Sequence, residues 1–254
     1  MINFFYEFNP LYLTIIMSLF GLFMTTLGSA IVFLFKTVSV KNLNYLLSLS
    51  AGIMLSASIF SLLIPALEHI NYNLLKILLL GIIIVLSFIS LIISDNICEK
   101  FLNKKSNSLI LIVSIILHNI PEGCAIGVAF GMLKYVGMNE VFGAISLALG
   151  IAIQNLPEGS AISIPLKRNG LSNFKSFLIG TLSGIVEPIA ALVGYFVVIK
   201  TQIIMPYLLA FASGAMLYVV VSELIPESMN NDKKKVNSLF FISGFIMMVI
   251  LEFI

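Results

Sequence analysis

Charged residues are scarce in this chain of 254 residues. Asp, Glu, Lys and Arg make up 10% of it, against about a quarter in soluble globular domains, whereas apolar residues make up 59% and the mean hydropathy is +1.10. This scarcity excludes a soluble enzyme and a disordered chain. It also excludes a nucleic-acid-binding protein, because a net charge of +2 provides no basic surface for a polyanion. A membrane protein is the class that remains.

Cysteine and histidine are also rare. The two cysteines, Cys98 and Cys124, form neither a disulfide framework nor a C-x-x-C metal-binding motif. An intramembrane metalloprotease needs an H-E-x-x-H motif, which the sequence lacks. A seven-helix hydrolase with a three-histidine zinc site needs more than the two histidines present. The sequence therefore predicts a protein that is not an enzyme and that uses no cofactor.

Apolar segments follow one another along the chain with only short connections between them. A membrane-spanning helix needs about 20 mostly apolar residues. We expect an all-α integral membrane protein that forms a single domain over residues 1–254, without room for a separate soluble domain. The eight predicted helices cover about residues 8–35, 42–67, 74–94, 109–133, 141–166, 176–199, 201–225 and 236–254.

Basic residues are distributed unequally between the two ends of these helices. If the N-terminus lies outside, eleven of the 14 Lys and Arg side chains lie at the cytoplasmic ends, and only Lys76, Lys134 and Lys200 lie at the outer ends. Because cytoplasmic loops collect Lys and Arg, this distribution predicts that both termini lie outside the cytoplasm. The first apolar run follows no Lys or Arg, so it does not have the pattern of a signal peptide.

A first internal repeat relates the second and seventh predicted helices. Residues 51–65 read A-G-x-M-L followed by S-x-x-I-P, and residues 213–226 read S-G-x-M-L followed by S-x-x-I-P. These two helices would cross the membrane in opposite directions. The pattern predicts an inverted repeat of helices 1–3 and 6–8 around a central pair, helices 4 and 5, which is common in secondary transporters.

A second repeat lies in that central pair. The sequence H-N-I-P-E-G at residues 118–123 recurs as Q-N-L-P-E-G at residues 154–159, near the middle of each helix. At 100° per residue, Glu122 projects between His118 and Asn119, and the second copy has the same geometry. Each helix can therefore offer one ligand to a first ion, another to a second ion, and a carboxylate that bridges both.

Three glutamates in the apolar stretches have no basic residue near them in the sequence. Glu122, Glu158 and Glu187 together would carry a charge of −3, and the spans that contain them hold no Lys or Arg. This charge cannot persist unpaired in a medium of low dielectric constant, so protons or a cation must compensate it. Imidazole, carboxylate and amide groups without a thiolate suit divalent ions such as Zn²⁺, Fe²⁺, Mn²⁺ or Cd²⁺.

The paired motifs resemble those of the ZIP (Zrt-/Irt-like protein) divalent metal transporters, and the second copy is similar to the GufA-like bacterial branch. The resemblance extends over the whole chain. It implies a transporter that moves zinc, and also iron, manganese or cadmium, into the cytoplasm through a binuclear centre in the plasma (inner) membrane. It also implies that helices 1, 4, 5 and 6 move against helices 2, 3, 7 and 8. Homodimers in the lipid bilayer are usual in the family, and no nucleic acid is involved.

The resemblance also implies which residues bind metal. One site would use His118, Glu122, Gln154 and Glu158, and the other would use Asn119, Glu122, Asn155, Glu158 and Glu187. Many members have His at the position of Gln154, and some have Asp at the position of Asn155. The first difference affects metal preference, and the second removes one charge from the second site. The His-rich loop of many eukaryotic members is not present in residues 95–108.

Three further residues are candidates for an entry or exit path. Glu68 and His69 lie in the outer loop after the second helix, and Glu223 lies near the inner end of the seventh. Each of them can equally be an ordinary interfacial side chain. Two alternatives to a metal carrier stay open at this point: a metal-selective channel of the same family, and a proton- or anion-coupled carrier that uses the buried glutamates without metal.

Overall fold

The computed structural model describes residues 9–34, 40–101, 107–137, 141–229 and 233–253. Within these ranges all regular structure is helical, and none of the residues forms a β-strand. Seven helical spans of the described residues are long and apolar enough to cross a membrane. A further helix of 30 residues, α6, lies among them. The chain is therefore a multi-pass membrane protein, as its composition predicted.

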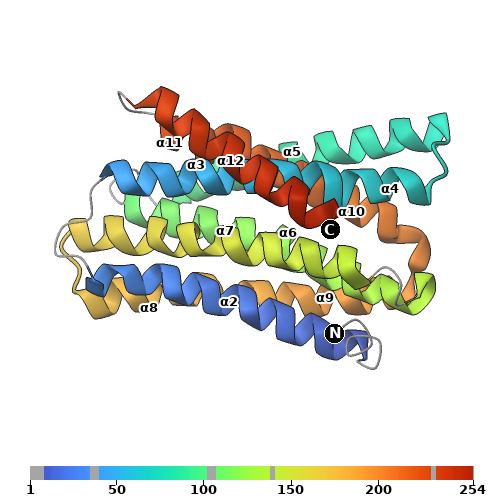
Figure 1. The fold of residues 1–254 in the computed structure, drawn as a ribbon, viewed down its shortest axis with the longest axis horizontal. Coiled ribbons are helices and arrows are strands. Elements are labelled where there is room, and N and C mark those ends of the chain that lie inside the picture. The colour runs from blue at the N-terminus through green and yellow to red at the C-terminus, as the bar shows by residue number, and fades with distance from the viewer. Residues whose placement is uncertain (1–8, 35–39, 102–106, 138–140, 230–232, 254) are drawn as a thin grey trace.

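The helices of the described residues form eight rods. The rods run side by side along the long axis of the molecule (Figure 1). Three of the rods consist of more than one helical segment. The rods are α2 (Pro10–Leu34); α3 (Val40–Ala57), η1 (Ser58–Leu63) and α4 (Ile64–His69); α5 (Leu74–Phe101); α6 (Asn107–Val136); α7 (Val141–Arg168); α8 (Asn173–Ser183) and α9 (Val186–Lys200); α10 (Met205–Val219), η4 (Val220–Leu224) and α11 (Ile225–Met229); and α12 (Lys234–Phe253).

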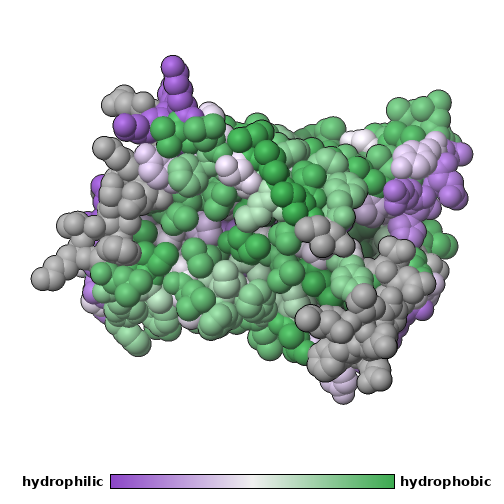
Figure 2. All heavy atoms as spheres, in the orientation of Figure 1, coloured by the Kyte–Doolittle hydropathy of each residue, from purple (hydrophilic) through white to green (hydrophobic). Residues whose placement is uncertain are grey.

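The surface of the molecule has an apolar middle and polar ends. On the face shown in Figure 2, hydrophobic residues cover the centre, and hydrophilic residues gather at the two ends of the helices. α5 exposes large apolar side chains along its length, among them Leu78, Ile82 and Ile89. In water such a surface would be unstable, whereas in a bilayer it faces lipid tails. Exposed apolar residues here therefore indicate the membrane-facing side and not a defect of packing.

The helices pack as two groups. In the first group, α6 packs along α9, and α2 packs along α7 and α8. In the second group, α3 packs along α12, and α5 packs along α10. The two groups meet chiefly where α7 lies against α3 and where α6 lies against α10. The first group corresponds to predicted helices 1, 4, 5 and 6, and the second to helices 2, 3, 7 and 8.

Two glycines of the repeated motif allow very close contact between helices of the first group. A β-carbon at Gly123 in α6 would overlap the backbone carbonyl oxygen of Glu187 in α9. A β-carbon at Gly159 in α7 would overlap the carbonyl oxygen of Thr25 in α2. Small residues let membrane helices approach until their backbones touch. Each motif glutamate is thus followed by the residue that holds its helix against a neighbour.

The first sequence repeat has a shared local structure. In each copy an α-helix gives way to a π-helical turn, η1 or η4, and the next α-helix has proline as its second residue, Pro65 or Pro226. Proline has no N–H to donate, and its ring clashes with the carbonyl four residues earlier, so the α-helical ladder cannot run through unchanged. The π turn absorbs this irregularity at the same place in both copies.

Candidate metal centre

Three helices of the first group bring polar side chains together in the interior. α6 and α7 each contribute one copy of the motif, and α9 contributes the third glutamate. Removal from water makes unpaired polar groups costly, so their arrangement has to be explained. The side chains, none more than 6% exposed, are Asn119, Glu122, Gln154, Asn155, Glu158 and Glu187.

A break in the sixth rod positions Glu187. α8 ends at Ser183, the backbone turns at Gly184 and Ile185, and α9 begins at Val186 with Glu187 in its first turn. The free N–H groups at a helix N-terminus favour negative charge, and Pro188 suits the first turn because no helical donor is lost there. Residues 183–188 thus place a carboxylate at the start of a helix in the middle of the apolar span Asn173–Lys200.

Two hydrogen bonds link glutamates to amide side chains of α7. Gln154 Nε2 donates to Glu122 Oε1 at 2.7 Å, and Asn155 Nδ2 donates to Glu187 Oε2 at 2.6 Å. A third amide, Asn119 Nδ2, donates to the backbone carbonyl of Ser183 at 3.0 Å. Short, charge-assisted hydrogen bonds such as the two to the carboxylates fix the orientation of the side chains. Adjacent residues of α7 therefore reach two different partners, one on α6 and one on α9.

Within the described part of the chain, the remaining oxygens of these five side chains stay unpaired. Five buried oxygens of this cluster have no hydrogen-bond partner among the described residues, and each such acceptor costs about 1–3 kcal/mol, or more when charged. All five are acceptors, and none of them receives a hydrogen bond from another member of the cluster. A cation is therefore the kind of ligand that would satisfy them. The five are Asn119 Oδ1, Glu122 Oε2, Gln154 Oε1, Asn155 Oδ1 and Glu187 Oε1.

The charge of the cluster leads to the same kind of ligand. Glu158 lies within electrostatic range of both Glu122 and Glu187. With all three ionised the cluster carries −3, and the sequence places no Lys or Arg within these spans. One divalent cation would leave a charge of −1, and two would leave +1. Either state is far less costly than −3 in a medium of low dielectric constant.

The donor atoms are mostly oxygens. No three His, Cys, Asp or Glu side chains in the described ranges lie close enough together to hold a metal ion by themselves. Amide oxygens would therefore have to complete a coordination shell. His118 lies in α6 directly before Asn119, but its side chain lies outside the part of the chain that the structure describes. Its role as the nitrogen ligand stays a prediction.

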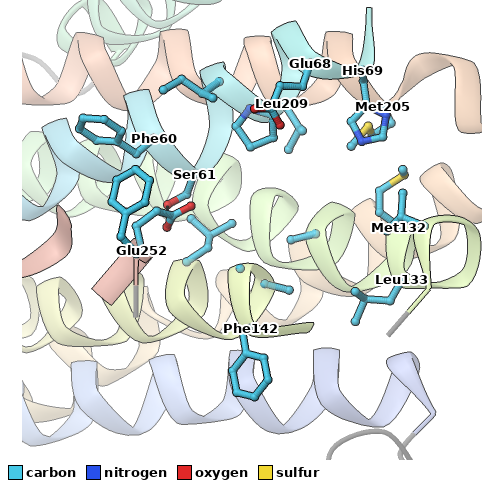
Figure 3. Close-up of a pocket in the computed structure, with 18 residues that line it drawn as sticks. Phe60, Ser61, Glu68, His69, Met132, Leu133, Phe142, Met205, Leu209 and Glu252 are labelled. Atoms are coloured by element: carbon cyan, nitrogen blue, oxygen red, sulfur yellow. Dashed lines mark hydrogen bonds between the residues drawn. The ribbon is translucent and has the colours of Figure 1, made fainter. Parts of the chain in front are cut away.

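The three candidate path residues lie on other helical segments than the residues of this cluster. Glu68 and His69, at the end of α4, are exposed and line a cavity of about 610 Å³ (Figure 3). Glu223 lies in η4 and is partly exposed. The structure thus brings together the six described residues of the cluster, and it places Glu68 and His69 at a cavity that none of these six residues lines.

One residue of this cavity was missed in the sequence. Glu252, in the last turn of α12, accepts a hydrogen bond of 2.6 Å from Ser61 Oγ, and both residues line the cavity. The signal was an acid near the end of the last helix, within the residues assigned to that span. Hydropathy alone did not indicate which residue this acid contacts.

Comparison with known proteins identifies the family. Residues 99–252 match the family model described as ZIP Zinc transporter. The chain belongs to the ZIP zinc transporter family. It is 48% identical over 143 residues to zinc transporter ZIP11 of Homo sapiens, a match that covers 56% of this chain and 42% of the human protein. The match thus spans less than half the length of that relative.

Two bacterial relatives support the family assignment. The chain is 36% identical over 149 residues to zinc transporter GufA of Myxococcus xanthus, which covers 59% of this chain and 56% of GufA. It is 31% identical over 227 residues to zinc transporter ZupT of Chlorobaculum parvum, which covers 80% of this chain and 82% of ZupT. The family predicted from the paired motifs is confirmed. These relatives are named as transporters and not as enzymes, in agreement with the sequence.

Proposed function

We propose that this ZIP family protein carries divalent transition-metal cations, Zn²⁺ foremost, across a membrane. The observation that carries the proposal is the set of five buried acceptor oxygens, from α6, α7 and α9, without a partner among the described residues. The names of the relatives support zinc as the ion. The same carboxylate and amide donors also suit Fe²⁺, Mn²⁺ and Cd²⁺.

The proposed centre holds two ions, with Glu122 and Glu158 bridging them. The two amide–carboxylate pairs support this division, because Gln154 pairs with Glu122 whereas Asn155 pairs with Glu187. An ion bound at either position would be coordinated by the amide oxygen. This coordination would replace the hydrogen bond that the amide N–H donates to the carboxylate. We assign His118, Glu122, Gln154 and Glu158 to one ion, and Asn119, Glu122, Asn155, Glu158 and Glu187 to the other.

Transport is proposed to run toward the cytoplasm across the plasma (inner) membrane, with both termini outside. The excess of Lys and Arg at one end of the helices supports this orientation. The six buried ligand residues all belong to the first helix group, so a movement of that group against the second would carry the ions with it. We propose alternating access of this elevator type, in a homodimer. Glu68 and His69 would lie on the entry path and Glu223 on the exit path.

The test is uptake by the purified chain in liposomes, with Zn²⁺, Cd²⁺, Fe²⁺ and Mn²⁺ offered separately. Glu122→Gln keeps the size of the side chain and an oxygen that accepts from Gln154, and it removes only the charge. We expect saturable uptake by the wild-type protein and none by this variant. Glu99→Gln removes an equal charge from α5, a helix that contributes no residue to the cluster, and should leave uptake unchanged.

Two results would contradict the proposal. Wild-type uptake by folded Glu122→Gln protein would remove this cluster from the transport path. Absence of uptake of all four metals by folded wild-type protein, together with proton or anion flux, would favour the metal-free carrier instead.

A further inference from the structure

A fourth helix of the first group lies against the buried cluster. The side chains of the cluster come from α6, α7 and α9, and α2 packs along α7 and also contacts α6 and α9 (Figure 1). Small residues let membrane helices approach until their backbones touch. The buried residues in the middle of α2 are all small or carry a hydroxyl group: Ser18, Gly21, Thr25, Gly28 and Ser29.

Gly21 is the residue of α2 that meets the cluster. A β-carbon at this position would lie 2.2 Å from Glu187 Oε1 and 3.1 Å from Asn155 Nδ2. Atoms that are not bonded do not approach to the first of these distances, because their preferred separation is about 3.5–4.0 Å. The Glu187 carboxylate therefore occupies the space that any other residue at position 21 would fill.

This contact differs from those of other tightly packed glycines in the same helix group. β-Carbons at Gly28, Gly123 and Gly159 would meet backbone carbonyl oxygens, which cannot move unless a helix moves with them. At Gly21 the obstructing atom is the far end of a long side chain. A methyl group at this position would therefore displace the carboxylate and leave the packing of the helices in place.

The oxygen beside Gly21 is the one that an ion could bind. Glu187 is fully buried, and its Oε2 accepts the hydrogen bond from Asn155, whereas its Oε1 has no partner among the described residues. α2 closes the cluster on the side of Gly21. A side chain at position 21 would push Oε1 away from α2 and back among the other acceptor oxygens. The space for an ion beside Glu187 would then be smaller.

We propose that Gly21 is a specificity-determining residue of the second ion site, which contains Asn155 and Glu187. Because this position has no side chain, the Glu187 carboxylate can lie against α2 and leaves room for an ion as large as Cd²⁺. The inference rests on the proposed function, which supplies the ion. Selection between ions of equal charge depends on the size of the site, and Cd²⁺ is a larger ion than Zn²⁺. Gly21 sets this size without binding the metal itself.

The experiment measures the binding of Zn²⁺ and of Cd²⁺ to the purified full chain by equilibrium dialysis. The second ion is identified as the one that Glu187→Gln does not bind. In Gly21→Ala the affinity for this ion should fall about 10–100-fold for Cd²⁺, as when a metal ligand loses its support, and by a smaller factor for Zn²⁺. The first ion should stay bound.

Gly150→Ala is the matched control. A β-carbon at Gly150 in α7 would lie 2.3 Å from Met248 Sδ, near the end of a flexible side chain that is not part of the cluster. The two substitutions thus add the same group against a movable side chain at nearly the same distance. Gly150→Ala should leave the affinities for both ions and both metals unchanged.

A double variant tests whether the effect of Gly21 passes through Glu187. Glu187→Asp shortens the side chain by one methylene group and withdraws the carboxylate from the overlap. Introduced into Glu187→Asp protein, Gly21→Ala should change the affinity for Cd²⁺ by no more than about twofold, since substitutions of residues in contact are not additive. The unfolding temperature without metal should show the same non-additivity. The double variant also serves as the test if Gly21→Ala alone folds poorly.

Two results would overturn the inference. The first is a second site in folded Gly21→Ala protein whose affinities for Cd²⁺ and Zn²⁺ are unchanged or fall by equal factors. The second is an equal effect of Gly21→Ala with and without Glu187→Asp. Wild-type protein that binds no second ion would instead contradict the proposed function, and the inference would fall with it. Wild-type protein that binds two ions, neither of them affected by Gly21→Ala, overturns the inference alone.

Discussion

The side-chain amide of Asn155 in α7 donates a hydrogen bond of 2.6 Å to the carboxylate of Glu187 in α9. Both side chains are fully buried. α9 packs mainly against α6, and α7 packs mainly against α2, so the bond is a polar link between helices with different main packing partners. Each partner keeps one oxygen without a hydrogen bond from the described residues, Asn155 Oδ1 and Glu187 Oε1. The pair is thus oriented for a ligand that both oxygens could bind.

Asn155→Asp should destabilise the metal-free protein and strengthen the binding of the second ion. The substitution replaces the donor with a second carboxylate beside Glu187, which removes a hydrogen bond to a charged group worth about 1.5–3 kcal/mol. The added negative charge increases the attraction for a cation. Without metal, thermal unfolding of the variant should therefore begin at a lower temperature than that of the wild-type protein. Zn²⁺ should raise the unfolding temperature of the variant by more than it raises that of the wild type.

Asn237→Asp is the matched comparison. Asn237 in α12 is also fully buried and donates through its amide to the backbone carbonyl of Ser228, at 2.5 Å. Its substitution should lower the unfolding temperature equally with and without Zn²⁺, since it lies outside the cluster. Equal effects of Zn²⁺ on the two variants would mean that Asn155 is not part of the metal centre.

Gln154→His should shift the preference of the transporter toward Zn²⁺. The wild-type side chain offers a neutral oxygen, whereas imidazole offers a nitrogen, which suits Zn²⁺ better than Mn²⁺. The ratio of Zn²⁺ uptake to Mn²⁺ uptake in liposomes should rise severalfold. Gln154→Asn, which shortens the side chain but keeps its chemistry, should reduce the uptake of both ions and leave their ratio near that of the wild type. If the ratio of Zn²⁺ uptake to Mn²⁺ uptake is the same in Gln154→His as in the wild type, Gln154 is not a metal ligand.

The buried cluster could be predicted from the sequence because its geometry is local. His118, Asn119 and Glu122 fall on one face of any regular helix, and the second copy repeats the pattern in the next span. The pairing of Asn155 with Glu187 could not be predicted in this way. It depends on where α8 ends and α9 begins, and on how closely α9 lies against its neighbours, which are properties of the packed structure.

The contacts missed in the sequence join residues that are far apart in the chain. Glu252 and Ser61 are separated by 191 positions, and no periodicity relates an acid at the end of one helix to a serine inside another. The same holds for Asp95, which accepts a hydrogen bond from Tyr218. Its helix, α5, continues to Phe101, beyond the apolar stretch that ended near residue 94. Hydropathy marks where a helix enters lipid, but not where its backbone stops being helical.

Ser213→Ala should lower stability without affecting metal binding. Ser213 Oγ donates to the backbone carbonyl of Ser58 at 2.9 Å, and both residues are fully buried. This bond joins the two copies of the first repeat at Ser58, the first residue of η1. Its loss should cost about 1 kcal/mol, since hydrogen bonds between membrane helices are of this size. The unfolding temperature should fall, and Zn²⁺ affinity measured by titration should not change. A loss of Zn²⁺ affinity would show that the second helix group contributes to the centre.

Gly123→Ala should reduce both stability and uptake, because its β-carbon would overlap the carbonyl oxygen of Glu187 and force α9 away from α6. The displacement would move the Glu187 carboxylate from its partner Asn155, so Zn²⁺ affinity should also fall. Gly143→Ala in α7 is the matched substitution, since no atom lies within 4 Å of a β-carbon there. It should leave uptake unchanged and should not lower stability, because the added methyl group meets no neighbouring atom. Equal behaviour of the two variants in thermal unfolding and liposome uptake would mean that close contact at Gly123 does not position Glu187.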